Sequence, residues 1–440
     1  MRALTSKSTF HSSAKSWACL PHKTRKLVYL CRRSFGTIAQ LVEQRTENPC
    51  VPGSNPGGTT IEAVRCAAFF FDLCVKNFNV QPDSTTWIQA LQDANADRVV
   101  WIHETALNPG LVNAHRRAIQ TATQLDVVEW PLNGGEHLKS WGCLDEMLSR
   151  FGQWSLTRSS VIISTGGGAM SDAVGFAASI WKRGVRVIHM PTTPLAAVDA
   201  AWGGKTAFNW DGNKNQVGTF HEPLAVHIDA HWMGTLDERE FRSGLAEMAK
   251  HALLDTHEFK RLTEQTPSGM PQSDTEAEAW TQLFLSSAQI KIDICTQDPL
   301  EKGVRTLLNL GHTVGHAIEA ATANTSTPWL HGEAVALGIH FCLHESECLV
   351  LDKSPLDDES VRSREAMSAW LRKHVPLPQT PIPESTVLWQ HMVHDKKNVG
   401  HCVRDVAWRG IGQLIWPVEW NSSEFEATWT TFVRSWNETS

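Results

Sequence analysis

Two histidines four residues apart, a third histidine further along and an isolated glutamate upstream are the side chains best suited to chemistry. His312 and His316 are spaced to share one face of a helix, His331 begins a His-Gly-Glu sequence, and Glu247 precedes them all. Neutral imidazoles with one carboxylate suit a catalytic Zn²⁺, which keeps a coordination position open for substrate. The spacing predicts a divalent-metal centre. The alternative is an ordinary helical pair in which neither His312 nor His316 binds a metal.

A glycine-rich turn near the middle of the chain is suited to a dinucleotide. Thr165-Gly166-Gly167-Gly168-Ala169-Met170-Ser171-Asp172 follows an expected strand and opens an expected helix. Glycines let the backbone approach a pyrophosphate, and a helix N-terminus supplies free N–H donors. The match to the dinucleotide fingerprint is incomplete, because Ser171 stands at the third glycine position and no acidic residue follows about 20 residues later. A tight turn without a ligand is equally compatible with these residues.

Three other segments place charged side chains beside turn or helix residues. Residues 134–139 form a turn with an acid and a base, and residues 199–215 place glycines beside lysines and asparagines, which suits an anionic, hydroxylated ligand. Glu247 and Lys250 share a helical face. Each has an ordinary alternative: a solvated loop, a surface loop and a helical ion pair.

The composition excludes several classes of protein. The 440 residues are enough for two or three domains. A net charge of −7 gives no reason to expect nucleic acid, and no apolar run reaches the roughly 18 residues of a membrane span. The 10 cysteines form no CxxC pair, which favours reduced thiols in a cytoplasmic protein over a disulfide framework.

The first 66 residues differ from the rest in charge, with 10 Lys and Arg against 3 acidic residues. They fit an organelle transit peptide, a disordered arm or translated non-coding sequence. We favour the third interpretation, because residues 36–60 resemble a translated transfer-RNA gene. We therefore expect residues 1–66 to be a non-native or disordered extension and leave them out of the predicted fold.

Residues 67–234 predict an α/β domain. Strands are expected at residues 98–102, 127–130, 159–164, 185–190 and 224–228, and helices at residues 113–125 and 172–182. Short apolar strands that alternate with helices predict a Rossmann-like parallel sheet covered on both faces.

Residues 235–440 predict an all-helical domain that binds the metal and the substrate. Helical spacing with few β-branched runs marks residues 238–254, 276–293, 315–321 and 333–349. Prolines between residues 376 and 383 mark a loop, and short helices are expected from there to the C-terminus. The fold class is therefore α/β followed by α.

Ordered motifs between residues 134 and 397 carry a family resemblance. They are Gly-Gly-Gly-x-x-x-Asp172, Lys182-Arg183-Gly, Pro191-Thr192-Thr193, Val198-Asp199-x-x-x-Gly-Gly-Lys205-Thr, Lys214-Asn215, Gly-Leu-Ala-Glu247-x-x-Lys250, Leu-Asn309-x-Gly-His312-x-x-Gly-His316-Ala, Leu-His331-Gly-Glu and Asp395-Lys396-Lys397. Together they resemble the 3-dehydroquinate synthase family of the sugar-phosphate cyclase superfamily.

The resemblance implies NAD⁺ and a divalent metal, normally Zn²⁺, with Co²⁺ as the alternative. The implied enzyme is a phosphorus–oxygen lyase that converts 3-deoxy-D-arabino-heptulosonate 7-phosphate into 3-dehydroquinate and phosphate, in the shikimate pathway to aromatic amino acids. Transient oxidation, phosphate elimination, reduction and intramolecular aldol closure are the expected steps. A homodimer with a small sugar phosphate as its ligand is expected, without nucleic acid or membrane.

The resemblance also implies roles for individual residues. Glu247, His312 and His331 become the expected metal ligands, and His316 becomes a substrate and proton-relay residue instead of a further ligand. The expected catalytic and substrate-binding residues are Lys250, His316, Arg305, Asn309, Lys205, Asn215, Arg183, Asp199, Lys291 and Lys396. The expected NAD⁺ contacts are Gly134, Gly135, Glu136, Lys139, Gly167, Gly168, Asp172, Thr192, Thr193, Lys205, Lys214 and Thr235.

The chain departs from the family pattern at three places: Ser171 replaces a glycine, Ala201-Trp202 replaces smaller and more polar residues, and His103-Glu104-Thr105 stands where an Asp-x-Asn contact to adenosine is usual. These departures concern mainly the adenosine end of the cofactor site.

Three alternatives remain at the level of sequence. Another sugar-phosphate cyclase, such as a valiolone-type synthase, usually lacks the histidine at position 316. A metal-dependent alcohol or glycerol dehydrogenase acting on a neutral alcohol would not need Lys205, Lys250, Lys291, Arg305 and Lys396. A homologue that only binds is disfavoured by the intact Glu247, His312 and His331.

Overall fold

The computed structural model describes residues 86–299, 301–348, 355–393 and 402–439. All of them belong to one compact unit that spans residues 74–440. The predicted extension of residues 1–66 and the predicted substrate ligand Lys396 lie outside the described residues. No helix in the described ranges is long and apolar enough to cross a membrane.

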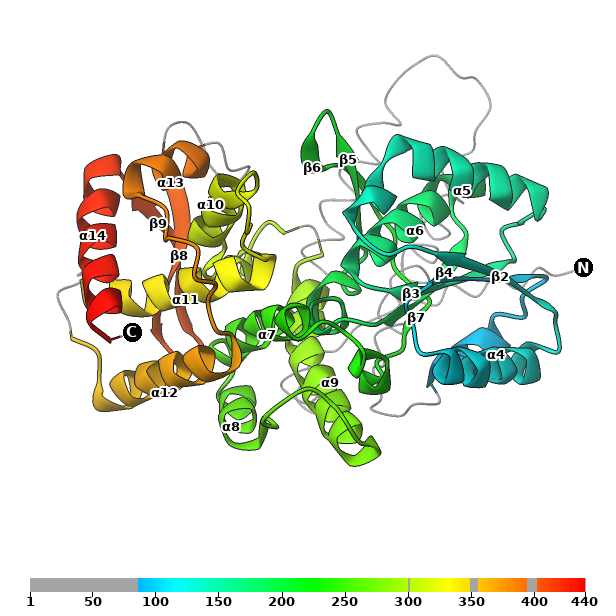
Figure 1. The fold of residues 1–440 in the computed structure, drawn as a ribbon, viewed down its shortest axis with the longest axis horizontal. Coiled ribbons are helices and arrows are strands. Elements are labelled where there is room, and N and C mark those ends of the chain that lie inside the picture. Colours follow the sequence, from blue (N-terminus) through cyan, green and yellow to red (C-terminus); the bar gives the residue numbers. More distant parts are fainter. Residues whose placement is uncertain (1–85, 300, 349–354, 394–401, 440) are drawn as a thin grey trace, which may run out of the picture. The chain divides into compact units, whose positions relative to one another are not determined.

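Five parallel strands form the central sheet of the α/β region, in the order β2-β1-β3-β4-β7 (Figure 1). Every strand expected from the sequence is present, within a few residues of its predicted limits. The strands are β1 (Val99–Glu104), β2 (Val127–Leu132), β3 (Val161–Gly166), β4 (Arg186–Pro191) and β7 (Ala225–Val226).

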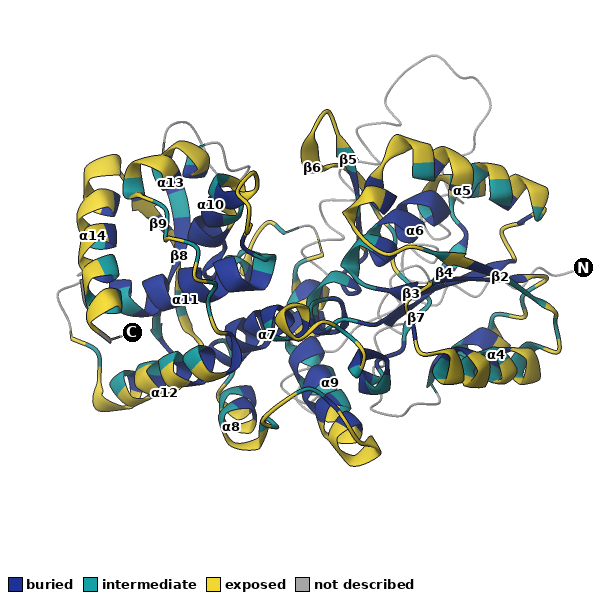
Figure 2. Ribbon diagram, in the orientation of Figure 1, coloured by how far each residue is buried: buried dark blue, intermediate teal, exposed yellow. Residues whose placement is uncertain are grey.

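Alternating side chains of these strands pack on opposite faces of the sheet, because successive residues of a strand point to opposite sides. Val100 and Ile102 of β1 belong to one core with α5 (Trp141–Gln153) and α6 (Gly168–Ile180). Val99 and Trp101 belong to another core with α3 (Thr86–Asp93) and α4 (Pro109–Thr123). In Figure 2 the central strands β3 and β4 are buried, as β1 is, while the outer sides of α4 and α5 are exposed. The predicted Rossmann-like sheet covered on both faces is confirmed.

A β-hairpin occupies part of the segment that the sequence suggested as a loop. Strands β5 (Lys205–Trp210) and β6 (Asn213–Phe220) pair antiparallel, and Asp211 and Gly212 between them both have positive φ, of 50° and 75°. An Asp-Gly pair favours the tight turn whose twist matches that of the two strands. The hairpin presents Lys205, Lys214 and Asn215 on regular strands instead of a loop.

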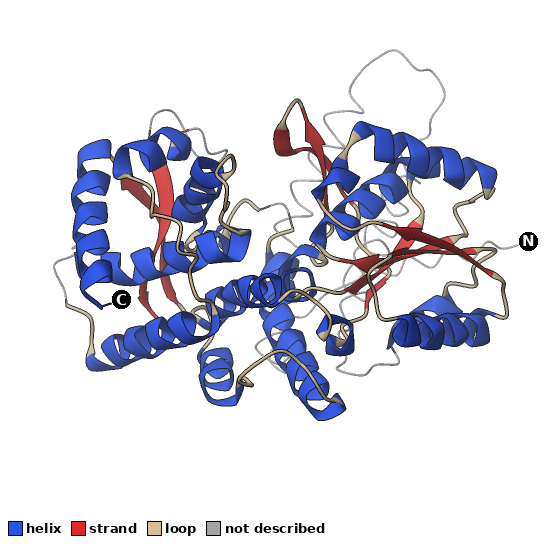
Figure 3. Ribbon diagram, in the orientation of Figure 1, coloured by secondary structure: helices blue, strands red, loops and turns tan. Residues whose placement is uncertain are grey.

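The second half of the chain is mainly helical, as predicted (Figure 3). Its helices are α7 (Glu238–Ala252), α8 (Thr256–Gln265), α9 (Asp274–Gln297), α10 (His312–Thr322), α11 (His331–Cys348), α12 (Asp358–His374), α13 (Ser385–Met392) and α14 (Ser422–Thr439). Shorter helices are η2 (Glu136–Lys139), η3 (Trp181–Arg183), η4 (Ala196–Ala200), η5 (Ala230–Met233) and η6 (Val304–Asn309), of which η4 is a π-helix.

The prediction of helices alone after the proline-rich loop is wrong over residues 403–420. Strands β8 (Val403–Gly410) and β9 (Gln413–Trp420) form an antiparallel hairpin there, and Gly412 in its turn has a φ of 72°. The hairpin is followed by the predicted type of element, α14. Its strands contribute Trp408 and Trp420 to the cores of this region.

Glycines allow α11 to approach its neighbours closely. A Cβ on Gly332 would lie 1.7 Å from the carbonyl oxygen of Ser243 in α7, and a Cβ on Gly338 would lie 2.0 Å from the carbonyl oxygen of Gly311. Gly311 itself has a φ of 74° and immediately precedes His312. These contacts fix the starts of α10 and α11, and therefore His312 and His331, relative to α7.

The contact between Gly338 and Gly311 can be tested by adding one methyl group. We expect Gly338→Ala to lower the free energy of unfolding by about 3 kcal/mol, because the methyl group meets backbone that cannot rotate away. Gly142→Ala is the matched control, since a Cβ at this helical glycine meets nothing within 4 Å. It should leave stability unchanged or raise it by up to about 1 kcal/mol. Urea titrations measure both, and equal stability of the two variants would contradict the packing argument.

Candidate active site

Three side chains from three helices converge on one point. Glu247 lies in the middle of α7, His312 begins α10 and His331 begins α11 (Figure 1). Oε1 of Glu247 lies 3.4 Å from Nε2 of His312 and 3.4 Å from Nε2 of His331. Two ligand atoms on a tetrahedral ion with bonds of about 2.0–2.1 Å lie about 3.3 Å apart. The spacing of the three side chains therefore fits a divalent metal ion.

The charge balance of this cluster also favours a cation. Burial raises the pKa of Glu247, but Lys250 and His312 outweigh burial and hold the pKa well below its usual range. Both carboxylate oxygens are buried and neither has a hydrogen-bond partner of good geometry, although the ammonium group of Lys250 lies against Oε2. An ionised carboxylate in this position is the kind of group that a bound metal neutralises.

The two histidines respond differently to burial. Burial lowers the pKa of His312 to about 4, so its ring is neutral at neutral pH. Burial also lowers the pKa of His331, but Glu247 and Glu319 outweigh burial and raise the pKa to about 10. Without a metal, the protonated His331 ring neutralises part of the acidic charge. A metal ion would replace that proton, because imidazole binds metals in its neutral form.

A second carboxylate holds His331 from the other side of its ring. Nδ1 of His331 lies 3.2 Å from Oε2 of Glu319, and Oε1 of Glu319 accepts a hydrogen bond of 2.8 Å from Lys214 of β6. A carboxylate behind a metal-binding histidine fixes its ring and raises its basicity. Lys214 thus holds the carboxylate of Glu319, and Glu319 in turn holds the ring of His331.

His316 is near this cluster but stands outside the group that could hold an ion. Its ring centroid lies 5.3 Å from that of His312 and 6.0 Å from that of His331. Among the described residues, the three whose ligand atoms approach one another here are Glu247, His312 and His331. The helical spacing of His312 and His316 alone suggests a different pair from the group that the structure brings together.

A row of buried charges extends from Glu247 through Lys250. Oδ1 of Asp199, in η4, lies 3.6 Å from Nζ of Lys250 and 2.9 Å from Nζ of Lys291 in α9. Burial lowers the pKa of Lys250, but Glu247 and Asp199 outweigh burial and raise the pKa above its ordinary value. Lys250 is therefore charged at neutral pH, and it can donate hydrogen bonds but cannot serve as a base.

Two further cations of the predicted substrate site, Arg305 and Lys205, contact a carbonyl oxygen and a carboxylate. Arg305 is buried, and its Nη2 donates to the carbonyl oxygen of Gly203 at 3.4 Å. Lys205 of β5 pairs with Glu301, which also accepts a hydrogen bond of 3.5 Å from Asn309. The structure thus brings together Lys205 and Asn309 through the carboxylate of Glu301.

The side chain of Glu104 lies against the glycine-rich turn. The N–H of Gly167 donates to Oε1 of Glu104 at 3.0 Å, and a Cβ on Gly134 would lie 2.6 Å from the Glu104 carboxyl carbon. Burial raises the pKa of Glu104 above its ordinary value, although the bond from Gly167 lowers it in part. The side chain that stands at one of the departures from the family pattern therefore lies against the expected pyrophosphate turn.

Some of the remaining predicted cofactor residues lie near one another around the same turn, whereas Lys205 and Lys214 pair with Glu301 and Glu319. Lys139 is buried, donates to Asp172 at 2.8 Å and to Asn215, and lies 3.5 Å from Glu136. A Cβ on Gly167 would lie 3.3 Å from the methyl group of Thr193. Thr235, by contrast, is exposed.

Two predicted substrate residues are not brought to the cluster. Arg183 is exposed and lines a surface hollow of about 780 Å³ together with Arg158 and Trp181. Lys396 lies outside the described residues. The roles of both remain predictions.

Sequence reasoning missed two carboxylates of the site. Glu319 follows His312 by seven residues, which is two helical turns, so its place on the same face of α10 could have been found. Glu301 lies in a connecting segment, and nothing in its spacing marked it.

The model of the 3-dehydroquinate synthase N-terminal family matches residues 129–243, and that of the C-terminal family matches residues 244–398. The 3-dehydroquinate synthase of Legionella pneumophila is 42% identical over 296 residues, which is 66% of this chain and 76% of that protein. The enzyme of Gloeobacter violaceus is 41% identical over 286 residues, or 65% and 76% of the two chains. That of Xylella fastidiosa is 38% identical over 302 residues, or 68% and 79%.

Solved structures share the fold at lower identity. A 2-deoxy-scyllo-inosose synthase, crystallised with carbaglucose-6-phosphate, NAD⁺ and Co²⁺, has a TM-score of 0.64 at 22% identity and covers 77% of this chain and 91% of its own. A 2-epi-5-epi-valiolone synthase from Streptomyces hygroscopicus with NAD⁺ and Zn²⁺ bound has a TM-score of 0.64 at 23% identity, with 79% and 93% covered. The sequence matches, which are closer than these structural ones, decide the family: the chain belongs to the 3-dehydroquinate synthases.

Proposed function

We propose that this chain converts 3-deoxy-D-arabino-heptulosonate 7-phosphate into 3-dehydroquinate and phosphate. The observation that carries the proposal is the convergence of Glu247, His312 and His331 beside the buried, charged Lys250, in a chain of this family. The geometry fits a metal, and the surrounding cations fit a substrate that carries a phosphate and a carboxylate.

We propose that Glu247, His312 and His331 hold a divalent metal, Zn²⁺ or Co²⁺. When bound, the metal would polarise a substrate hydroxyl and favour its ionised form. Three protein ligands leave a coordination position for substrate, as in other catalytic zinc sites. Glu319 would orient His331 and keep its Nδ1 engaged, so that Nε2 faces the ion.

We propose that NAD⁺ binds along the glycine-rich turn at the start of α6. When bound, it would accept a hydride from the substrate and return it later, so that no net oxidation occurs. The N-terminus of α6 offers N–H groups to the pyrophosphate. The proposed contacts are Gly134, Gly135, Glu136, Lys139, Gly167, Gly168, Asp172, Thr192, Thr193, Lys205, Lys214 and Thr235.

The protein's own side chains mainly bind and orient the substrate. Lys250 is fixed between Asp199 and Glu247, and its third N–H can be offered to a substrate oxygen without any rearrangement. Lys291 and Arg305 add positive charge from α9 and η6, which favours the substrate anions. His316, exposed beside the metal ligands, is suited to carry a proton to or from the substrate. Lys205, Asn215, Asn309, Arg183, Asp199 and Lys396 complete the proposed substrate-binding set.

The fold alone does not choose between this activity and its relatives, because an iron-containing alcohol dehydrogenase also shares it, with a TM-score of 0.54 at 12% identity. The buried Lys250 and Arg305 favour an anionic substrate over a neutral alcohol. His316 favours dehydroquinate synthase over valiolone-type cyclases, as the sequence suggested.

We also propose that the enzyme acts in the cytoplasm as a homodimer. The absence of any CxxC pair among the 10 cysteines supports the cytoplasm, and the family resemblance supports the dimer. We place the domain boundary between residues 234 and 235, where the short helix η5 ends and the helical region begins.

The proposed activity is tested by incubating the purified chain with the heptulosonate phosphate, NAD⁺ and Zn²⁺. Phosphate and dehydroquinate should appear in equal amounts, without accumulation of NADH, because the hydride is returned. Phosphate is measured by a coupled assay and NADH by its absorbance. Net NADH formation would identify a dehydrogenase instead, and dependence on a heptulose phosphate that lacks the carboxylate would identify another cyclase.

The support of His331 by Glu319 makes a second prediction. Glu319→Gln should weaken metal affinity by about 10–100-fold while the three ligands remain, because the ring of His331 loses its carboxylate partner. Turnover should recover at high Zn²⁺, whereas His331→Ala should remain inactive. Glu264→Gln, at an exposed position of α8, is the matched control. Metal titrations with a competing chelator measure the affinity, and unchanged affinity in Glu319→Gln would contradict the role of this carboxylate.

A third prediction concerns Lys250. Lys250→Ala should lower kcat/KM on the order of 100-fold or more, because a fixed donor to the substrate is lost. It should weaken substrate binding more than NAD⁺ binding, and it should cost about 3–5 kcal/mol of stability, because Glu247 and Asp199 lose a buried partner. Lys260→Ala on α8, where the side chain is exposed, is the control. Calorimetric titration with each ligand separates the two affinities, and an unchanged substrate affinity would count against the proposed role.

A further inference from the structure

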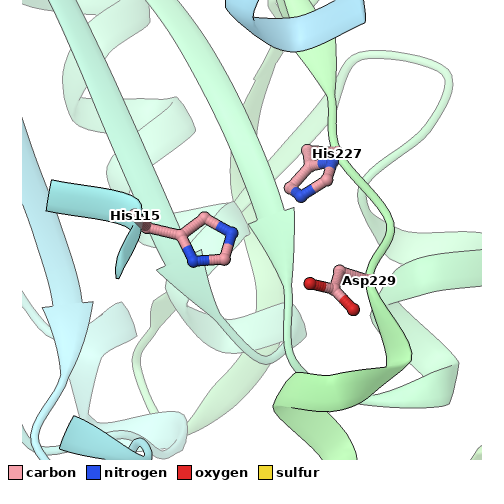
Figure 4. Close-up of side chains that lie close together, drawn as sticks. All are labelled: His115, His227 and Asp229. Carbon is pink, nitrogen blue, oxygen red and sulfur yellow. The ribbon is translucent and has the colours of Figure 1, made fainter. Parts of the chain in front are cut away.

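A second group of metal-binding side chains lies in the α/β region, away from Glu247. His115 comes from α4, His227 follows β7, and Asp229 precedes η5. One ligand atom from each residue lies within 4.8 Å of the others, and Figure 4 shows the three side chains pointing toward one another. None of them belongs to the set of residues proposed above for substrate, cofactor or metal.

His115 is oriented for metal binding by its own helix. Its Nδ1 lies 3.0 Å from the carbonyl oxygen of Leu111, one turn earlier in α4. A carbonyl oxygen can only accept, so Nδ1 carries the proton and Nε2 keeps a lone pair. Metal-binding histidines in proteins characteristically donate their other N–H in this way. Burial lowers the pKa of His115, which further favours the neutral ring.

His227 supplies the second imidazole. Its ring is only 7% exposed, and within the described residues it makes ring contacts but no side-chain hydrogen bond. Trp87 lies at 5.2 Å and His115 at 5.7 Å between ring centroids. Burial lowers the pKa of His227 to about 4, so the ring is neutral at neutral pH. A neutral, buried imidazole without a hydrogen bond has its lone pair available.

Asp229 is held by one oxygen and open at the other. Its Oδ1 accepts a hydrogen bond of 3.0 Å from the backbone N–H of His231 and lies 2.6 Å from Nδ1 of the same residue. Oδ2 appears in no hydrogen bond within the described residues. The side chain of Asp229 is 20% exposed, which leaves a path for an ion from solvent. A carboxylate fixed through one oxygen is a common metal ligand.

We propose that His115, His227 and Asp229 form a binding site for a divalent transition-metal ion of the Zn²⁺, Co²⁺ or Ni²⁺ class. Two imidazoles and one carboxylate suit such ions, whereas Mg²⁺ and Ca²⁺ prefer oxygen ligands. Bonds of about 2.0–2.2 Å require the ligand atoms to close from within 4.8 Å to about 3.3 Å. Rotation of the three side chains supplies this closure, because none of the free ligand atoms is held by another bond.

The ion would have a structural role. The three ligands come from α4, from the end of the edge strand β7 and from the segment that leads into η5. A shared ion would fasten the helix that covers one face of the sheet to the edge of that sheet. The aromatic contacts of His115 with Trp232, at 4.6 Å, and of His227 with Trp87 explain the burial of the rings. The carboxylate of Asp229 also caps η5 through the N–H of His231, and a ligand atom of Asp229 lies within 4.8 Å of one on each of the two histidines.

The site is tested with untagged full-length protein that carries His331→Ala, which removes a ligand of the other proposed metal centre. Zn²⁺ is titrated calorimetrically and against a chromophoric chelator, and thermal unfolding is followed with and without Zn²⁺. The His331→Ala protein should bind Zn²⁺ at His115, His227 and Asp229, and its Tm should rise with Zn²⁺. Adding His115→Ala, or separately His227→Gln, should remove one bound ion per chain and abolish the rise.

The control is His257→Ala, which removes an exposed histidine of α8 and should leave the binding unchanged. His115→Ala in the otherwise unaltered chain should keep its turnover, because His115 belongs to neither the catalytic nor the substrate-binding set. The proposal is overturned if the His331→Ala protein binds no Zn²⁺ with an effect on Tm, or if its Zn²⁺ binding is the same with and without His115. Since His115 is half-buried on a helix surface, its replacement by alanine is compatible with folding.

Discussion

A row of charges that alternate in sign, all buried except the partly exposed Asp199, holds the candidate active site together. Lys291, Asp199, Lys250 and Glu247 follow one another across α9, η4 and α7, and each is paired with the next. Removing water from such charges is costly, and the cost is offset only while every charge keeps its partner. The row ends at Glu247, whose Oε1 faces the imidazoles of His312 and His331. The four charges of the row cancel one another, and the two imidazoles allow that end to take a further positive charge, either a proton on His331 or a metal ion.

The sequence predicted the framework of this site well, and for identifiable reasons. The strands of the sheet were found because β1 and β3 are short, apolar and bounded by polar residues, a pattern that local sequence reveals. The expected ligand set of Glu247, His312 and His331 came from motif resemblance, since spacing alone pointed to His312 and His316. The structure places Glu247, His312 and His331 together.

What the sequence did not predict depends on contacts between distant segments. Glu301 joins the site through Lys205, about 100 residues away in the chain, so no local pattern marks it. The spacing of Glu319 from His312 marks its helical face, but its contact with the distant Lys214 could not be predicted. The β8–β9 hairpin was missed because Ile415 and Pro417 on the exposed face of β9 hide, at the level of sequence, an alternation of burial that the structure shows. Close contacts such as that of Gly338 with Gly311 are likewise invisible until the helices are packed.

The carboxylate of Glu104 already occupies the glycine-rich turn as an anion. It accepts the N–H of Gly167 and fills the space beside Gly134. A phosphate that arrives at the same N–H must displace this carboxylate, so its net affinity is the difference between two anions competing for one donor. Because burial raises the pKa of Glu104, acidification neutralises this carboxylate more readily than it would neutralise a glutamate in water. A phosphate that binds at this turn thus exchanges with the carboxylate of Glu104, and its apparent affinity depends on pH.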